Sequence, residues 1–228
     1  IDAGNVMDLS WAERYSISAL VIAWAGGMES GHALADVLTG VTEPGGRLAA
    51  SIARRYEDAP SAQNFGDPDV TNYVEDVFVG YRYYETFAPG AAQFHFGEGL
   101  GYTSFSLSLG DFGSDATRAC IEVTATNTGE RDGDTVVQAY LETPDGKLSQ
   151  PARRLAAFSR TGSVAAGESA TVSLEVDLRD FASYDDSGAT GHRSAYVLEP
   201  GTYRLHVGHS VKETEVAGEI EIGELIVV

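Results

Sequence analysis

The sequence predicts an α/β fragment, part of an α/β sandwich layer, followed by an all-β sandwich. The first part is indicated by an apolar run over residues 18–24 with a helical stripe after it. The second is indicated by apolar and polar residues that alternate with the period of half-buried strands. An aromatic segment between them keeps neither period. We therefore divide the chain into an α/β part (1–72), an inter-domain seam (73–105) and a β-sandwich (106–228).

The α/β part has the pattern of one strand–turn–helix unit. Trp11 to Tyr15, entered through an N-cap-like Asp8, is predicted to be a short helix. The apolar run Ser18–Trp24 is typical of a strand buried on both faces of a parallel sheet. A helical stripe follows over Glu29–Thr39 and ends at Gly40. Because one unit cannot cover both faces of a sheet, we expect the last piece of a larger layer.

The seam is dense in aromatic side chains and interrupted by glycines. Leaving large apolar side chains in water is unfavourable by about 1.5–3 kcal/mol each, so this segment is expected to lie between larger bodies. We assign an inter-domain structural role to five of its residues: Glu75, Tyr81, Arg82, Phe96 and Tyr102.

The β part contains four clear alternating sets. They begin at Ala119, Val137, Val172 and Tyr203 and are separated by turn residues such as Asn127-Thr-Gly129. About seven short strands in this length predict a β-sandwich.

Composition excludes several classes of function. The 228 residues carry a net charge of −19, which opposes binding to nucleic acid or to an anionic membrane. No apolar run is long enough to span a bilayer. Cys120 is the single cysteine, so no intrachain disulfide and no cysteine metal site is expected. The chain starts at Ile1 without a visible signal peptide, which leaves a bacterial cytoplasmic and a secreted location open.

Motifs for common chemistries are missing. Ser30 follows a predicted strand, but the G-x-S-x-G pattern of a nucleophilic serine is absent, and a capping or turn role is favoured. The histidines have no metal-ligand spacing, and the carboxylate pairs Asp132/Asp134 and Asp185/Asp186 lack a calcium-loop pattern. We expect no metal and no cofactor.

Two carboxylates have surroundings in which a raised pKa is plausible, as glycoside hydrolysis requires of its acid. These are Glu29 and Glu75. The favoured structural readings are a first-turn helix residue for Glu29 and a buried partner of Arg82 for Glu75.

The order of motifs along the chain resembles that of family-3 glycoside hydrolases. The end of that family's α/β-sandwich domain is similar to residues 24–40 and 44–48, and its next signatures are similar to 73–75, 79–84 and 94–103. Its fibronectin type III-like domain, of the immunoglobulin/fibronectin III-like class, is similar to 127–129, 137–140, 151–158 and 200–208. Met28 and Ser30 depart from the common pattern, which often has Gln and Gly there.

The resemblance implies the C-terminal region of a retaining, β-glucosidase-like enzyme acting on β-linked glucosides or related sugars. The nucleophile and the acid/base would lie in a barrel domain and an earlier sandwich segment, whose motifs do not occur here, so we expect no catalytic residue. The implied partners are the carbohydrate substrate and the missing barrel. The turn after the predicted strand, with Trp24, Met28 and Glu29, is expected to approach the sugar.

Two alternatives remain open. The β-sandwich could be a stand-alone carbohydrate-binding module, if Tyr140, Tyr184, Tyr196 and Tyr203 formed an exposed row. The chain could also be an independent hydrolase that uses Glu29 and Glu75.

Overall fold

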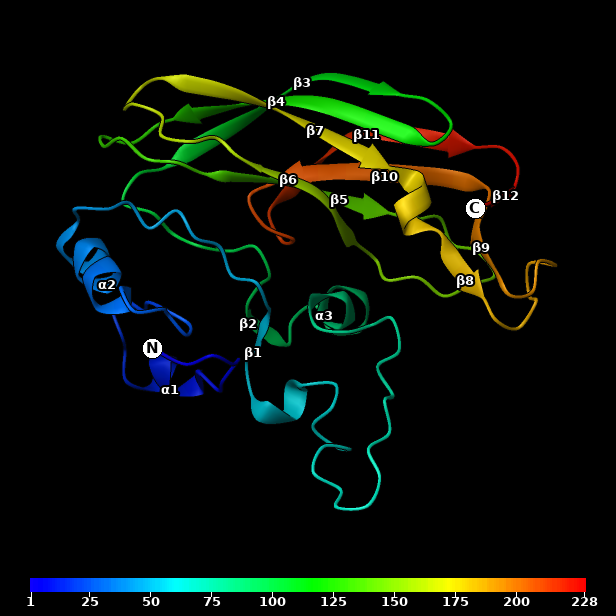
Figure 1. The fold of residues 1–228 in the computed structure, drawn as a ribbon, viewed down its shortest axis with the longest axis horizontal. Coiled ribbons are helices and arrows are strands. Elements are labelled where there is room, and N and C mark those ends of the chain that lie inside the picture. Colours follow the sequence, from blue (N-terminus) through cyan, green and yellow to red (C-terminus); the bar gives the residue numbers. More distant parts are fainter.

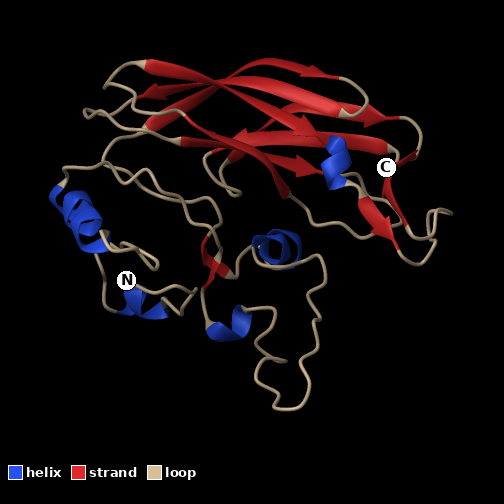
Figure 2. Cartoon of the chain, in the orientation of Figure 1, coloured by secondary structure: helices blue, strands red, loops and turns tan.

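The computed structural model describes residues 1–228 and has two unlike parts (Figure 1). A flattened β-sandwich forms one side of the molecule. A looser arrangement of short helices and long connections lies beneath it, as the colouring in Figure 2 makes clear. No helix has the length and apolar character needed to cross a bilayer.

The N-terminal part contains few regular elements. They are α1 (Ser10–Arg14), α2 (Ser30–Thr39), β1 (Ile52–Ala53), the short 3-10 helix η1 (Tyr56–Asp58), α3 (Tyr81–Phe87) and β2 (Ala92–Phe94). The strands β1 and β2 pair antiparallel, with Ile52 opposite Phe94. Both helices predicted here form within one residue of their expected bounds. Gly40 ends α2 in the left-handed conformation, at φ 75°.

The predicted strand Ser18–Trp24 is wrong. This segment is irregular and belongs to no sheet. The segment is hydrogen-bonded to Ile1. The Ile1 ammonium donates to Val21 O at 2.7 Å, and the Ile1 carbonyl accepts from Ala23 N at 2.8 Å. A parallel strand forms only beside a neighbouring strand, and none lies next to this segment. For the same reason α2 has no buried residue.

The β-sandwich consists of two main sheets. One has the order β3 (Phe105–Ser114), β4 (Arg118–Asn127), β7 (Ser169–Asp177). The other has the order β11 (Thr214–Ile222), β10 (Gly201–Gly208), β5 (Val136–Glu142), β6 (Arg154–Arg160). These seven strands confirm the predicted number. A small third sheet of β12 (Ile226–Val227), β9 (Ala195–Leu198) and β8 (Ser183–Asp185) extends one end, next to the 3-10 helix η2 (Leu178–Phe181).

The core lies between the two main sheets and contains the residues that the alternation predicted. Ile121 and Val123 of β4, Leu141 of β5 and Leu205 of β10 are almost fully buried. Sequence periodicity was sufficient here because each strand finds its hydrogen-bonding partners within the same chain.

Asn127 explains the Asn-Thr-Gly turn. Its fully buried amide donates to Arg131 O and Val164 O at 2.7 and 2.9 Å. Its Oδ1 accepts from Thr103 Oγ1 at 2.6 Å and from Gly129 N at 3.1 Å. One side chain thus bonds four groups where three segments meet, and only the Val164 carbonyl has a second partner, Gly133 N at 3.1 Å.

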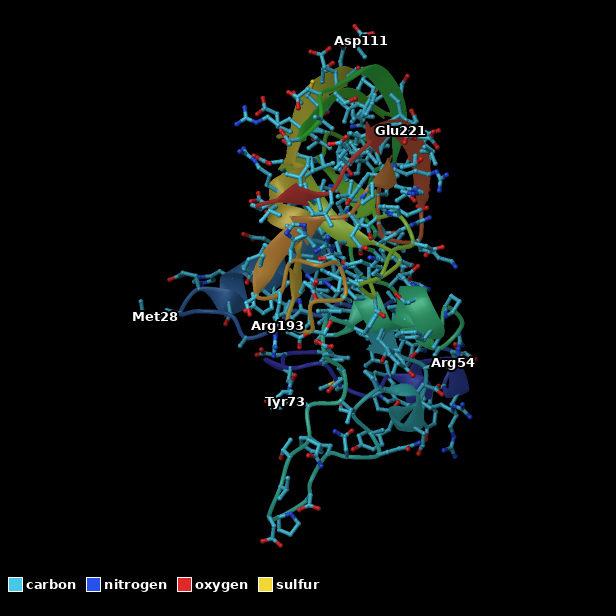
Figure 3. All side chains as sticks on the ribbon, turned by 90° about the vertical axis from the view of Figure 1, so that its right-hand side faces the viewer. Met28, Arg54, Tyr73, Asp111, Arg193 and Glu221 are labelled. Atoms are coloured by element: carbon cyan, nitrogen blue, oxygen red, sulfur yellow. The ribbon has the colours of Figure 1, made fainter.

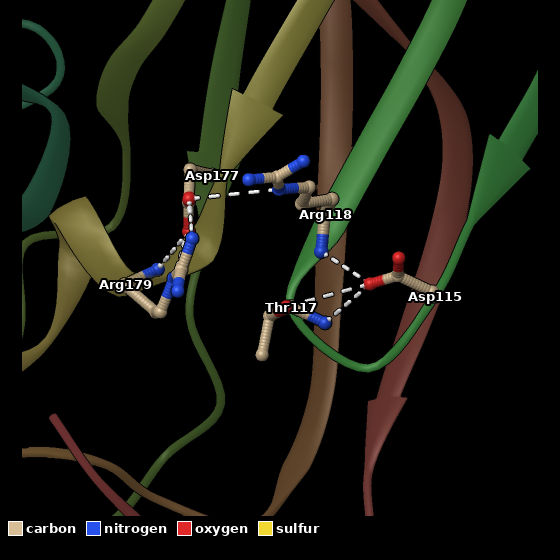
Figure 4. Close-up of polar contacts among 5 residues, drawn as sticks. All are labelled: Asp115, Thr117, Arg118, Asp177 and Arg179. Carbon is tan, nitrogen blue, oxygen red and sulfur yellow. Dashed lines mark hydrogen bonds and ion pairs between the residues drawn. The ribbon is translucent and has the colours of Figure 1, made fainter.

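At the far end of the sandwich, two aspartates hold the strand ends (Figure 4). Asp115 accepts from the backbone amides of Thr117 and Arg118 at 2.8 and 2.9 Å, which closes the turn from β3 to β4. Asp177 accepts from Arg179 Nε at 2.8 Å. Arg118 Nε lies 3.8 Å from the Asp177 carboxylate and links the two clusters.

Candidate functional site

The aromatic seam packs directly onto the β-sandwich through Tyr81 and Phe96. The two rings stack with centroids 4.4 Å apart, and both meet Tyr140 of β5 edge-on at 6.3 and 6.4 Å. Tyr81 Oη also accepts a hydrogen bond from Leu155 N of β6 at 2.8 Å. Two of the predicted inter-domain residues are therefore brought together, on the outer face of the four-stranded sheet.

Tyr140 and Gln138 form the sandwich side of this contact. Tyr140 is completely buried, and its Oη donates to Gln138 Oε1 at 2.6 Å. Burial raises the pKa of the Tyr140 phenol well above its usual range. Gln138 Nε2 donates to the carbonyls of Gly97 and His209. Gly97 has φ 84°, and a Cβ there would lie 2.1 Å from Gln138 Oε1, so a glycine is required for this close approach.

Tyr102 of the seam and Arg131 of the sandwich bind the C-terminal end of α2. Tyr102 Oη donates to Val37 O at 2.7 Å. The Arg131 guanidinium lies 5.5 Å from the Tyr102 ring centroid and donates to Gly40 O at 2.6 Å. The Val37 carbonyl, which also accepts from Gly40 N at 3.0 Å, and the Gly40 carbonyl at the end of α2 are thus bound by one side chain from the seam and one from the sandwich. We define these contacts of Tyr102 and Arg131 as the α2 clasp.

Glu75 and Arg82 do not form the expected ion pair. Glu75 precedes α3 in an irregular stretch and closes a turn through its carbonyl, which accepts from Phe78 N at 2.8 Å. Arg82 instead lies near Arg154, whose pKa is lowered to about 10 by burial and by the Arg82 charge. Arg154 donates to Phe181 O and covers the Phe181 ring at 4.8 Å.

A buried pair in the seam escaped the sequence analysis. His95 Nδ1 lies 3.2 Å from Glu85 Oε1, and both side chains are largely inaccessible. The backbone amide of His95 donates to Glu98 Oε2 at 2.8 Å. Its position between two aromatic residues was the sequence signal that could have indicated burial.

Two of the three predicted sugar-contacting residues, Met28 and Glu29, are open to solvent. Met28 is completely exposed and points away from the body of the molecule (Figure 3). Glu29 Oε2 lies 2.6 Å from His32 Nδ1, with both side chains exposed. Trp24 is half-buried and has a positive φ of 54°. A Cβ at Gly26 would lie 2.3 Å from Ser30 Cβ, which explains the glycine that begins this tight turn.

The carboxylates do not form a reactive or metal-binding constellation. No group of three His, Cys, Asp or Glu side chains has the arrangement of a metal site. Asp185 is buried and accepts from the backbone amides of Gly188, Ala189 and Thr190 at 2.7 to 3.0 Å. These bonds and one from the Thr190 hydroxyl hold the pKa of Asp185 far below its usual range, as expected for a carboxylate that orders a loop.

The row of exposed tyrosines proposed for a binding module does not exist. Tyr140 and Tyr203 are buried, and Tyr203 belongs to the sandwich core. Tyr184 and Tyr196 are cross-strand neighbours on β8 and β9, half-exposed, with ring centroids 5.1 Å apart.

Comparisons with known proteins agree along the chain. Residues 1–102 match the family model of the glycosyl hydrolase family 3 C-terminal domain, and residues 135–211 match that of the fibronectin type III-like domain. A beta-glucosidase from Ruminococcus albus is 41% identical over 94% of this chain and 23% of its own length. Beta-glucosidase A from Butyrivibrio fibrisolvens is 39% identical over 95% of this chain and 28% of its own length.

A solved structure gives the same result. The crystal structure of a beta-glucosidase from Paenibacillus barengoltzii superposes with a TM-score of 0.93 and is 43% identical. It covers 99% of this chain, which corresponds to 26% of that protein. In these relatives the matched region is thus about a quarter of a larger protein.

Proposed function

This chain belongs to glycosyl hydrolase family 3 and corresponds to the C-terminal portion of its members; on that premise we propose that it serves a retaining, β-glucosidase-like enzyme acting on β-linked glucosides or related sugars. The observation that carries the proposal is the likeness to beta-glucosidases over nearly the whole chain, with folds that superpose at a TM-score of 0.93. The reacting carboxylates would lie in the remainder of that enzyme.

Within it, the chain would be a structural and substrate-shaping region. The seam supports this role, because Tyr81 and Phe96 tie the N-terminal part to the sandwich by stacking and hydrogen bonds. We also propose the segment boundaries 1–72, 73–105 and 106–228, because the contacts of Tyr81 and Phe96 lie between the N-terminal part and the sandwich.

The expected partner of the N-terminal part is the barrel domain of the same enzyme. Large apolar side chains are exposed along this part, including Met28, Phe65, Tyr73 and Leu100. Figure 3 shows Met28 and Tyr73 pointing outward. Apolar surface of this extent is typical of an interaction site, whereas the core of the sandwich is covered by its own two sheets.

The turn with Trp24, Met28 and Glu29 is our candidate for contact with the sugar. Support comes from its exposure and from its fixed shape, set by the close approach of Gly26 to Ser30. Glu29 and His32 there offer hydrogen-bonding groups beside the apolar Met28 side chain.

The proposal is tested by assaying residues 1–228 and the full-length enzyme side by side with p-nitrophenyl β-glucoside. We expect turnover by the full-length enzyme and none by residues 1–228. Turnover by residues 1–228 that disappears in Glu29→Gln or Glu75→Gln would establish an independent hydrolase instead. Failure of the full-length enzyme to cleave any β-glucoside would refute the assigned activity.

A stand-alone carbohydrate-binding module is the second candidate, favoured by the paired rings of Tyr184 and Tyr196. This alternative predicts that the sandwich binds insoluble β-glucan in a pull-down assay. The double variant Tyr184→Ala/Tyr196→Ala should then lose this binding.

A further inference from the structure

A polar cleft of about 660 Å³ lies between α3 and the connection from β5 to β6. One wall is formed by Glu85, Thr86 and Phe87 at the end of α3. The opposite wall is the connection 142–153, and Lys212 closes one side. No residue expected to contact sugar or to react lines this cleft.

The walls of the cleft are held in place by the protein itself. The Glu199 carboxylate accepts from the backbone amides of Lys147 and Leu148 at 2.7 and 3.0 Å. Ala152 N donates to Thr86 Oγ1 at 2.9 Å, which joins the two walls. A Cβ at Gly146 would lie 2.4 Å from Glu199 Oε2, so the connection follows the Glu199 side chain closely. The cleft is therefore preformed, and a ligand would not need to order it.

Two charged side chains in the lining have no partner within the chain and are open to a ligand. The side chains of Asp145 and Lys212 form no ion pair, and together they present an acceptor and a donor.

The cleft also has an aromatic surface. The Phe87 ring is 59% exposed and is supported from one side by Phe78, with centroids 4.7 Å apart. An exposed ring beside unpaired donors and acceptors suits a ligand with an apolar face and a rim of hydroxyl groups. A pyranose has this character, because its C–H bonds form one face and its hydroxyls the edge.

Other ligand classes fit less well. Glu85, Glu142 and Asp145 outnumber Arg153 and Lys212 in the lining, and the chain as a whole carries a charge of −19. A phosphate or another anion would therefore be repelled. The carboxylates do not converge on a metal position.

We propose that this cleft binds a neutral saccharide, with a sugar ring on Phe87 and its hydroxyls bonded to Asp145 and Lys212. The choice of a β-linked gluco-oligosaccharide rests on the proposed function. The built cleft and its unpaired groups stand independently of it.

The test is titration of residues 1–228 with cellotetraose, followed by calorimetry and by backbone amide shifts in NMR spectra. We expect saturable binding, with shifts concentrated at residues 143–153. Phe87→Ala should raise the dissociation constant about tenfold or more. A melting scan of each variant verifies the fold.

Phe158→Ala is the matched control, since Phe158 on β6 is 67% exposed and lies outside the cleft. It should leave the affinity unchanged. The proposal is overturned if cellotetraose does not saturate up to about 10 mM, if Phe158→Ala weakens binding as much as Phe87→Ala, or if binding is lost in Tyr184→Ala. Hydrolysis of p-nitrophenyl β-glucoside by the full-length enzyme reports separately on the proposed function.

Discussion

Truncation of Tyr81 should strongly destabilise the contact between the seam and the sandwich. Removing a large aromatic side chain from a packed site costs about 3–5 kcal/mol, and the half-buried state of Tyr81 places it at the lower end. Tyr81→Ala also leaves Leu155 N without its acceptor, which adds about 1 kcal/mol. We therefore expect Tyr81→Ala to lower the free energy of unfolding by about 4 kcal/mol. Tyr81→Phe keeps the stack on Phe96 and should cost about 1 kcal/mol.

The measurement is urea denaturation of residues 1–228, followed by far-ultraviolet circular dichroism. Tyr15→Ala is the control, because the Tyr15 ring is exposed and stacks on no other aromatic ring. Its one cation–π contact is with the neighbouring Arg14. It should change the free energy of unfolding by less than about 0.5 kcal/mol. A loss below about 1 kcal/mol for Tyr81→Ala would refute the reasoning that this ring fastens the seam to the sheet.

Three further predictions concern the glycine, amide and carboxylate positions described above. Gly97→Ala should destabilise the fold by about 2 kcal/mol or more in urea denaturation, since the methyl group meets Gln138 Oε1 at φ 84°. Asn127→Ala should cost about 3 kcal/mol in the same assay, because four hydrogen bonds are lost and three of the groups have no other partner; a change below about 1 kcal/mol would contradict this. The hydrogen bonds from Arg179 lower the pKa of Asp177 to about 2, so its contribution to stability is present above pH 4 or so and is lost as the pH falls towards 2. Melting temperatures measured from pH 6 to pH 2 should therefore fall less steeply for Asp177→Asn than for the unaltered chain.

The sandwich could be predicted because the alternation of apolar and polar residues is visible within each strand and recurs from strand to strand. Each predicted set of alternating residues, such as the one around Ile121 and Val123, lies opposite another set in the same chain. The segment 18–24 shows the limit of this reasoning. Its composition is that of a buried parallel strand, but the ladder depends on neighbours that do not lie beside it. The apolar stripe of α2 was recognised correctly as helical, yet its burial could not be inferred from period alone.

The candidate site was predicted in part. Aromatic density identified Tyr81 and Phe96 as seam residues, and the structure places them against each other. The role of Tyr140 was missed, because a residue opposite the core face of a half-buried strand is expected in water. In β5 both faces are covered, one by the core and the other by the seam, so residues 137–141 are buried without alternation. Sequence period cannot reveal a second cover that comes from a distant segment.

The α2 clasp links the β-sandwich, through α2, to the exposed turn that presents Met28. α2 has ten residues and is therefore a rod of about 15 Å. Tyr102 and Arg131 donate hydrogen bonds at the C-terminal end of this helix. The turn that presents Met28 lies at its N-terminal end. We therefore expect a tilt of the β-sandwich to displace that turn as well.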